Sequence, residues 1–455
     1  MNTTVLYTGL GKISFDTSRM ALLKILGILI LPVFGGIFHT ACYLVVTAWC
    51  LLSVRRALEG LILLWLLTFL NPGIYSLSSL EGALRWLPLF ASTFTMLRIV
   101  VFSREFKIPR TVGWLTVYAL GVMILAIIGS RVPLVSIFKV MSFYIGSATI
   151  LIGFQVQKEK FRYWESWFKT LLKAILLLSL PLIIMDWGYT RNGTGFQGVL
   201  NHPQTFGPVI GLLLSWFFAN GISNKNHTVW SWFILGIGVI SIIATESRTA
   251  LLVFIGGIGI AGFFSLYRDQ RILRWLNLKK LAVVIPLIGI GILVGIANSS
   301  TIIGAVQDFV LKRNDNVSLE QSFQKSRGFL IDQSMQNFTE HPVVGIGFGI
   351  SSVPSEEMSI SRDPVFGLPI GASVEKGFLP SAILEETGIL GMALFVILLG
   401  SVLRPIIAKK VWFPSLVLIT GALLMNLGEA TLLSMGGNGL LLWLLIGFAS
   451  IHSYK

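Results

Sequence analysis

The sequence predicts an all-α polytopic membrane protein, and three observations lead to this fold class. Hydrophobic residues make up 54% of the 455 residues and charged residues only 12%, whereas a soluble domain carries about 25% charged residues. The mean hydropathy of the chain is +0.80. Apolar runs of about 20 residues, each long enough to cross a bilayer as a helix, recur along nearly the whole length. The alternating segments of about ten residues that mark a membrane barrel are not seen.

We expect about 12 to 14 transmembrane helices that form one integral membrane domain over residues 1–455. The first two expected spans meet at Pro32, Gly35 and Gly36, so they form either a tight hairpin or one long broken helix. The expected spans are 20–36, 38–54, 57–71, 83–102, 112–129, 134–153, 168–185, 205–221, 229–244, 249–266, 281–298, 381–402, 412–429 and 436–452.

The charge distribution predicts how these spans are oriented. The formal net charge is +14, from 35 Lys and Arg against 21 Asp and Glu. The basic residues lie mostly in short loops beside the spans, which fits topology and membrane lipids as partners rather than nucleic acid. Because alternate loops are rich in Lys and Arg, we assign them to the cytoplasmic side. This orientation, in the cytoplasmic (inner) membrane, places residues 299–380 as a large exoplasmic, or periplasmic, loop.

This large loop is the longest hydrophilic segment, and its first half predicts a helix. The stretch "LEQSFQKSRGFLIDQSMQNF", residues 319–338, repeats apolar residues at helical spacing along one face. We therefore expect an amphipathic helix across the mouth of the membrane domain. The following residues, 341–373, are rich in Gly, Pro and Ser and predict an ordered loop.

Arginines on the exoplasmic side oppose the insertion bias, so each needs a reason. The stretch "ATESRTALL", residues 244–252, places Glu246 and Arg248 at the junction of two apolar runs. Arg131, Arg191 and Arg327 are expected on the same side. Together these cations could clamp a phosphate or pyrophosphate, because guanidinium groups offer planar, bidentate donors. The alternative is that Arg248 reaches lipid headgroups, with Glu246 as its ion-pair partner.

Other outer-face residues give weaker signals. The loop 186–204, "DWGYTRNGTGFQGVLNHPQ", combines aromatic, amide and hydroxyl groups that suit either a sugar or an interfacial belt. His202 in this loop could act as a base near neutral pH or be an ordinary polar loop residue. Cys42 and Cys50 fall in one apolar run, and no metal-ligand spacing is present. We therefore expect buried cysteines, no metal and no cofactor.

Three stretches occur in order between residues 190 and 400. They are "ATESRTALL", then "SRGFLIDQSMQNFTEHPVVGIGFG", in which an Arg precedes a helix that ends in Pro-x-x-Gly-x-Gly, and then "AILEETGILGMALFVILL", which contains Glu-x-Gly-x-x-Gly. In this order, with a large outer loop, they resemble the O-antigen ligase and O-antigen polymerase superfamily of membrane glycosyltransferases.

The resemblance implies a GT-C-like helical fold and an exoplasmic glycosyltransferase. Such enzymes take a glycan from a polyprenyl-pyrophosphate-linked donor and pass it to a hydroxyl of a glycan or lipid-linked acceptor, with inversion and without a metal. By matching position, Arg248 and Arg327 would hold the pyrophosphate, and Arg131 and Arg191 would help by location. The supporting residues within the matched motifs are Glu246, Ser247, Glu386 and Gly388.

One departure from the family pattern bears on the reaction. Ligases of this family carry a His-Asn or His-Ser step shortly before the Glu-x-Gly-x-x-Gly motif, and this His is their presumed base. Here the region reads "SVEKGFLPSAILEETG" and holds Glu375 and Lys376 but no His. Glu375 could accept a proton from an acceptor hydroxyl, and so could His202. A polymerase, or a transferase with another acceptor, is favoured over a lipopolysaccharide ligase.

Two other function classes stay open at this point. The chain could be a transporter or flippase of lipid-linked glycan or a small anion, which predicts polar residues at the midplane and broken helices. Acidic residues are scarce inside the expected spans, and no chain of buried Asp, Glu and His residues is evident. The other possibility is a structural or assembly subunit whose outer loop has no chemistry.

Overall fold

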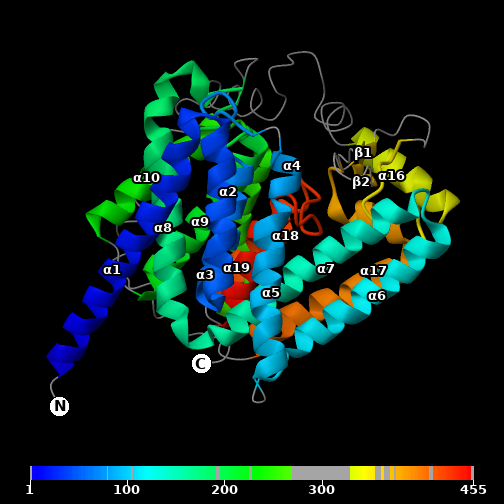
Figure 1. Ribbon diagram of the computed structural model, residues 1–455, viewed down its shortest axis with the longest axis horizontal. Helices are drawn as coiled ribbons and strands as arrows, with labels where there is room; N and C mark the ends of the chain where they lie inside the picture. Colours follow the sequence, from blue (N-terminus) through cyan, green and yellow to red (C-terminus); the bar gives the residue numbers. More distant parts are fainter. Residues whose placement is uncertain are drawn as a thin grey trace.

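A computed structural model describes residues 3–78, 80–103, 106–190, 195–224, 228–268, 328–353, 360–362, 369–372, 376–408 and 413–451. Within these residues the chain is a bundle of helices with one short pair of strands (Figure 1). The helices and strands are α1 (Thr3–Ile30), η1 (Leu31–Phe34), α2 (Gly36–Leu52), α3 (Val54–Thr68), α4 (Glu81–Leu84), α5 (Trp86–Phe102), α6 (Arg110–Gly129), α7 (Pro133–Val156), η2 (Lys158–Lys160), α8 (Phe161–Ser179), η3 (Leu180–Ile184), η4 (Asp186–Gly188), α9 (Pro203–Asn224), α10 (Val229–Ala244), α11 (Arg248–Leu251), η5 (Leu252–Gly256), α12 (Gly257–Arg268), α16 (Phe329–Glu340), β1 (Ile360–Arg362), β2 (Pro369–Ala372), α17 (Leu379–Ala408), α18 (Phe413–Met425) and α19 (Gly439–Ile451).

The helices confirm the predicted all-α polytopic class. Among the described residues, eight stretches are long and apolar enough to cross a membrane, and α2, α10, α18 and α19 are shorter apolar helices. The expected span 281–298 lies outside the described residues. The expectation of a loop after α16 needs one correction. Strands β1 and β2 pair antiparallel there, because two short extended segments can satisfy each other's backbone groups.

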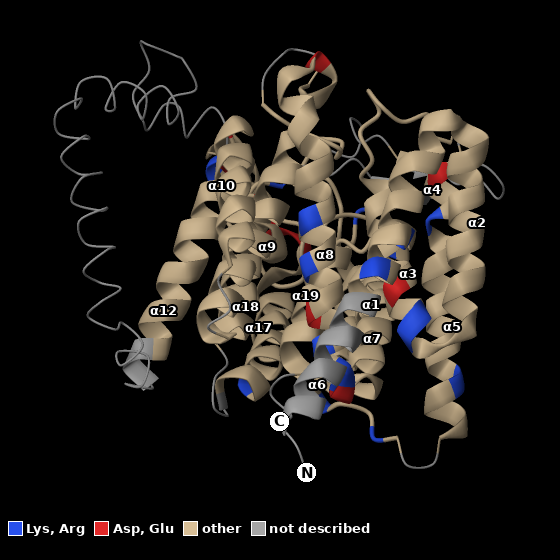
Figure 2. Ribbon diagram, turned by 90° about the vertical axis from the view of Figure 1, so that its left-hand side faces the viewer, with Lys and Arg blue, Asp and Glu red and all other residues tan. Residues whose placement is uncertain are grey.

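The two ends of the bundle differ in character. Helix α1 begins and α19 ends at one end, whereas α4, α16 and both strands lie at the other (Figure 1). Figure 2 shows the same arrangement from the side, with long uncharged stretches on α10 and α12. We call the end with α4 and α16 the outer end and the opposite end the inner end. The assignment of the outer end to the exoplasmic side remains a prediction from the loop charges.

Helix α3 forms the centre of the core. Every residue from Ala57 to Leu67 is buried, so α3 is covered by protein on all sides. Its start is capped by Ser53, whose hydroxyl accepts a hydrogen bond from the backbone N–H of Arg56 at 3.3 Å. Helix α9 is almost as deeply buried. By contrast, Ile37 and Phe102 are 85% and 80% exposed, as expected of side chains that face lipid.

The junction of the first two spans is settled by packing. A short 3₁₀ turn, η1, and Gly35 separate α1 from α2. Helix α1 packs against α8, whereas α2 packs against α3 and α5. The two spans are therefore separate helices that diverge into different parts of the bundle, and they are not a closely packed hairpin.

Two helices carry buried carboxylates that the sequence did not single out. Glu59 in α3 is fully buried, accepts a hydrogen bond from the Nε1 of Trp49 at 3.1 Å and forms an ion pair with Lys24 at 2.5 Å. Glu165 in α8 pairs with Lys169 at 2.7 Å. Each carboxylate has its own cation, as buried charges require, and the two belong to separate clusters near the inner end. They tie helices together and do not form a continuous ionisable path.

Candidate functional site

The "ATESRTALL" stretch forms a tight turn at the outer end, between α10 and α11. Helix α10 ends at Ala244, and Ser247 caps α11 by accepting a hydrogen bond from the backbone N–H of Ala250 at 3.4 Å. The hydroxyl of Thr245 donates to the carbonyl of Ile242 at 2.6 Å. The small polar residues of the turn are thus used locally, and this explains their burial.

The two charged residues of the turn are presented differently. Glu246 is exposed and has a φ of 53°, the only positive φ among the described residues that are not glycine. A left-handed conformation costs free energy in a residue with a Cβ and often marks a functional site. Arg248, the first residue of α11, is partly buried. A π-helical turn, η5, follows α11, and such turns also concentrate at functional sites.

Arg248 has no protein counter-charge within the part of the chain that the structure describes. Its Nε and Nη2 atoms are buried and have no hydrogen-bond partner there. It does not form the ion pair with Glu246 that the headgroup alternative included. Buried guanidinium N–H groups without an acceptor are unfavourable, so this site fits an anion that is not part of the described protein.

A second part of the outer end is built by the glycine-rich loop after α16. Helix α17 contains a break at Gly388, where φ is 63° and ψ is −167°. The break frees two carbonyls, which accept hydrogen bonds from the loop. The backbone N–H of Ile346 donates to the backbone carbonyl of Glu385 at 2.9 Å, and the backbone N–H of Gly347 donates to the backbone carbonyl of Glu386 at 3.0 Å. The "GIGFG" motif therefore forms a backbone dock for a broken helix and not a nucleotide loop.

Glycine is required on both sides of this contact. A Cβ on Gly388 would overlap the carbonyl oxygen of Val343, and a Cβ on Gly347 would overlap the hydroxyl of Ser130. The positive φ of each position is also costly for any other residue. The two family motifs thus contact each other directly, although about 40 residues separate them in the sequence.

A buried ionic cluster lies beside this dock. The ammonium of Lys376 lies 2.8 Å from Oε2 of Glu385 and 3.2 Å from Oε1 of Glu386. The side chain of Asn337 in α16 donates to Oε1 of Glu385 at 2.7 Å. Arg131 Nη2 donates to Oδ1 of Asn337 at 2.9 Å. We refer to these five residues as the ionic cluster; it joins α16, α17 and the α6–α7 turn.

The cluster decides what two of its members can do. Lys376 serves as the counter-ion of two carboxylates, so it is a structural cation and not an evident base. Arg131 has one terminal nitrogen on Asn337, while its Nη1 is buried without a partner among the described residues. Arg131 is therefore partly committed to protein contacts and retains one donor for a ligand.

The C-terminal outer loop, residues 426–438, connects the two parts of the site. A Cβ on Gly428 would overlap the hydroxyl of Thr249, the neighbour of Arg248. Two residues further on, the backbone N–H of Ala430 donates to the carbonyl of Lys376 at 3.1 Å. This loop thus lies directly against both α11 and the ionic cluster.

The sequence reasoning did not single out this connecting loop. Its available signal was the polar and glycine-rich composition "NLGEATLLSMGGN" between two apolar helices. Asn426, which is 1% exposed, folds the loop by accepting hydrogen bonds from the backbone of Thr431 and Leu432 at 2.9 Å and 2.8 Å. A buried asparagine at the end of an apolar helix is the feature that could have drawn attention.

The remaining predicted residues are placed only in part. His202 is exposed directly before α9, and its Nδ1 accepts a hydrogen bond from the backbone N–H of Gln204 at 3.1 Å. The next residue, Pro203, and Thr245 of the Arg248 turn both lie close to Gly195. His202 is therefore near the Arg248 turn. Arg191, Arg327 and Glu375 lie outside the described residues.

The described residues contain no group of three or more His, Cys, Asp or Glu side chains that could hold a metal ion. Cys42 and Cys50 are buried and unpaired as expected.

Comparison with known proteins supports the resemblance seen in the sequence. Residues 233–396 match the family model described as O-antigen ligase. This segment includes the Arg248 turn, α16, the glycine-rich loop and the broken start of α17. No curated protein matches the chain. The matched segment supplies the Arg248 turn and the dock of the outer-end site, and the match supports the similarity of this part of the chain to the O-antigen ligase and O-antigen polymerase superfamily.

Proposed function

We propose that this protein is a glycosyltransferase that acts at the exoplasmic face of the cytoplasmic membrane and moves a glycan from a polyprenyl-pyrophosphate donor to an acceptor hydroxyl. The observation that carries the proposal is Arg248. Its guanidinium is partly buried, without a described protein partner, at the outer end of an apolar helix. A lipid-linked pyrophosphate meets both demands of such a position, because its charge lies at the interface and its chain lies in the bilayer.

The roles of the other residues follow from their positions. Arg131 offers its remaining Nη1 donor, and Arg327 and Arg191 would complete the anion site from segments beside the described ones. An arginine cluster would stabilise the charge that develops on the leaving pyrophosphate, which is where electrostatic catalysis acts. We propose inversion at the sugar and no metal, as the family resemblance implies.

The acceptor hydroxyl needs a base, and two residues are candidates. Lys376, the described residue nearest the position of the family's absent His, is held between Glu385 and Glu386. Glu375 precedes it directly, and His202 borders the Arg248 turn. We keep both Glu375 and His202 as proposed bases. Because the family His is missing here, we favour a polymerase, or a transferase with a non-lipopolysaccharide acceptor, over a lipopolysaccharide ligase.

The transporter alternative gains little from the fold. The break in α17 at Gly388 comes nine residues after the helix begins at the outer end, and its freed carbonyls bind the glycine-rich loop. The break therefore serves as a structural dock for the loop, and this accounts for the broken helix without a transport site.

The test compares Arg248→Ala with Arg110→Ala in purified protein supplied with a polyprenyl-pyrophosphate oligosaccharide and a matching acceptor. Arg110 is the matched control, because it is an exposed arginine that also begins a helix, α6, at the opposite end. We expect Arg248→Ala to lose at least about a hundredfold in transfer rate, as for loss of one transition-state donor, and Arg110→Ala to keep wild-type transfer. Equal transfer by both variants would reject the proposed function.

A deletion strain distinguishes polymerase from ligase. Loss of long glycan chains with short units still attached to the acceptor indicates a polymerase. Accumulation of free lipid-linked glycan without conjugate indicates a ligase. Uptake or flipping by the purified protein in liposomes, with no transfer, would favour the transporter.

A further inference from the structure

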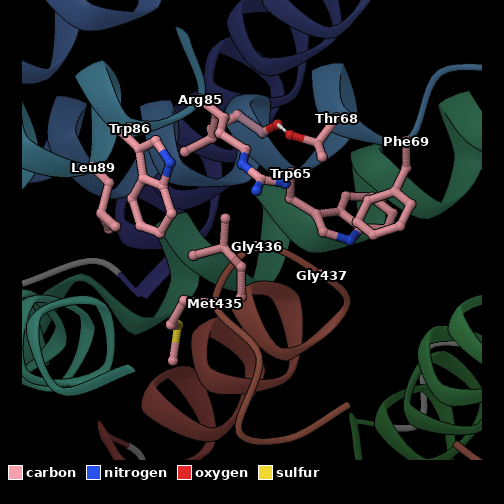
Figure 3. Close-up of a pocket in the computed structure, with 11 residues that line it drawn as sticks. Trp65, Thr68, Phe69, Arg85, Trp86, Leu89, Met435, Gly436 and Gly437 are labelled. Atoms are coloured by element: carbon pink, nitrogen blue, oxygen red, sulfur yellow. Dashed lines mark hydrogen bonds between the residues drawn. The ribbon is translucent and has the colours of Figure 1, made fainter. Parts of the chain in front are cut away.

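A groove at the outer end lies between α3, α5 and the C-terminal outer loop, and Arg248 is not among the residues that line it. Its walls are aromatic, from Trp65, Phe69 and Trp86, and its floor includes Gly436 and Gly437. Figure 3 shows the side chain of Arg85 extending into this groove between Trp65 and Trp86. None of these residues entered the predicted site.

Among the described residues that line the groove, Arg85 is the one that carries a charge. Its side chain donates no hydrogen bond to any described residue, and its Nε is buried without a partner. Glu81, one turn earlier, forms no ion pair with it within the described residues. An outward-facing arginine opposes the insertion bias, and a buried N–H without an acceptor is unfavourable. The guanidinium of Arg85 lies over the ring of Trp86, with Cζ 5.6 Å from the ring centroid, and its N–H donors are left for an anionic ligand.

The walls of the groove are fixed in ways that suit a ring-shaped ligand. Trp65 is fully buried, and its indole N–H donates to the side chain of Asn438 at 3.3 Å. Trp86 stacks on Phe90 with ring centroids 6.3 Å apart. The negative faces of aromatic rings pack well against the C–H faces of a sugar. A Cβ on Gly436 would lie 3.3 Å from Nη1 of Arg85, so glycine leaves room beside the guanidinium.

The groove is continuous with the candidate transfer site through one loop. The C-terminal outer loop touches Thr249 at Gly428, Lys376 at Ala430 and Arg85 at Gly436. Eight residues separate Gly428 from Gly436, so this path is at most about 28 Å long. A glycan of several sugars held at the transfer site could therefore reach Arg85 along the outer face.

A lipid headgroup is the other anion at this depth, but the walls argue against it. Trp65 belongs to the fully buried helix α3, and the floor is the loop itself, so the back and floor of the groove lie on the interior side of the bundle; only Trp86, which stacks on the 53% exposed Phe90, lies at the lipid-facing rim. The lipid-facing side of α5 is marked instead by exposed residues such as Phe94, which is 56% exposed.

We propose that Arg85 and Trp86, at the mouth of the groove, form a subsite for an acidic sugar of the glycan, a sugar ring that carries a carboxylate or a phosphate. This proposal rests on the proposed function, because it assigns the glycan as the ligand. Arg85 binds the acidic group, the indole of Trp86 packs against the ring, buried Trp65 closes the back of the groove, and the subsite holds the glycan chain away from the transfer centre.

The binding test uses the full chain in phosphatidylcholine nanodiscs, with trigalacturonic acid as the acidic probe and its fully methyl-esterified form as the neutral match. We expect Arg85→Gln to bind the acid at least about tenfold more weakly, the loss of one charged hydrogen-bond pair. Gly436→Val, which fills the groove and leaves the charge, should also weaken binding. Arg98→Gln is the control, because Arg98 is an exposed arginine near the inner end of α5, the helix that Arg85 directly precedes. The neutral ester should bind weakly and equally to wild type and Arg85→Gln.

Three results would overturn the subsite. The first is no binding of trigalacturonic acid by wild type, and the second is equal binding by Arg85→Gln and wild type. The third is measured in parallel nanodiscs that also contain phosphatidylglycerol: loss in Arg85→Gln of phosphatidylglycerol enrichment around the protein, with unchanged saccharide binding, would assign a lipid headgroup. The transfer assay separates this proposal from the proposed function. Arg85→Gln should still transfer glycan but alter product length, whereas Arg248→Ala should not transfer. Active Arg248→Ala with weakened saccharide binding by Arg85→Gln would reject the proposed function and leave the subsite standing.

Discussion

Replacing Lys376 by Met tests whether the ionic cluster holds the outer-end site together. The Lys376 side chain is 3% exposed, and its partners Glu385 and Glu386 are 0% and 10% exposed. Solvent therefore screens this pair very little. Removing one partner of a buried ion pair costs about 3–5 kcal/mol, because the other charge is left uncompensated. Each 1.4 kcal/mol is a factor of ten in an equilibrium, so local opening should rise between about a hundredfold and a few thousandfold.

The effect should be local to the elements that the cluster joins. Asn337 connects α16 to Glu385, so the amides of α16 report the opening. Hydrogen exchange of the protein in nanodiscs, followed by mass spectrometry, measures their protection. We expect Lys376→Met to lose protection in α16 and the glycine-rich loop, while peptides of α3, which lies in the centre of the core, keep theirs. Lys158→Met, a substitution of an exposed lysine at the inner end, should change neither region.

A second substitution separates the charge effect from simple loss of packing. In Lys376→Met with Glu385→Gln the fully buried carboxylate is neutral, so most of the lost protection should return. The hydroxyl of Ser352 also donates to Oε2 of Glu385, at 3.1 Å. Unchanged α16 exchange in Lys376→Met would refute the reasoning, since it would mean that the hydrogen bonds from Asn337 and Ser352 satisfy Glu385 without the lysine. The electrostatic explanation would be wrong if α16 in the double variant were no better protected from hydrogen exchange than α16 in Lys376→Met.

Two further predictions concern close contacts of glycine. Gly388→Ala should lower the free energy of unfolding, measured by thermal unfolding in detergent, by more than about 2 kcal/mol. The reason is that the substitution combines a positive φ of 63° with overlap of a backbone carbonyl. Gly400→Ala in the same helix has open space around its Cβ and should be neutral or slightly stabilising; equal effects of the two would contradict the proposed dock. Gly428→Ala should reduce glycan transfer by displacing α11, and adding Thr249→Ala, which removes the overlapping hydroxyl, should restore most of it. Transfer unaffected by Gly428→Ala would show that the C-terminal outer loop does not position Arg248.

Much of the fold could be predicted because hydropathy is a local property. Runs such as residues 112–129 and 205–221 are long and apolar enough to indicate membrane helices without any knowledge of their neighbours, and α6 and α9 occupy them. The helical spacing of apolar residues likewise predicted a helix within residues 319–338, and α16 covers the described part of it. The strands β1 and β2 were missed, because a pair of three- and four-residue strands has too few residues to show a period.

The candidate site could be predicted only as a set of residues. The order of three motifs along the chain pointed to Arg248, Glu386 and Gly388, and the resemblance to the family came from that order. The roles of Arg191, Arg327 and Glu375 remain predictions, since these residues lie outside the described part of the chain. His202 is found beside the Arg248 turn, but whether it acts as a base also remains a prediction.

The sequence alone therefore determined that this is a membrane protein of many helices, which superfamily it resembles and which motifs carry that resemblance, because composition, period and motif order are all local properties of the chain. Only the tertiary structure decided that the glycine-rich loop docks on a broken helix, that Lys376 is bound between two carboxylates, and that residues 426–438 run past Arg248, Lys376 and Arg85. These facts depend on side chains that meet across long sequence separations, such as the 206 residues between Arg131 and Asn337. The free energy of a charge or a hydrogen bond is set by its partners and its burial, and neither is a local property of the sequence.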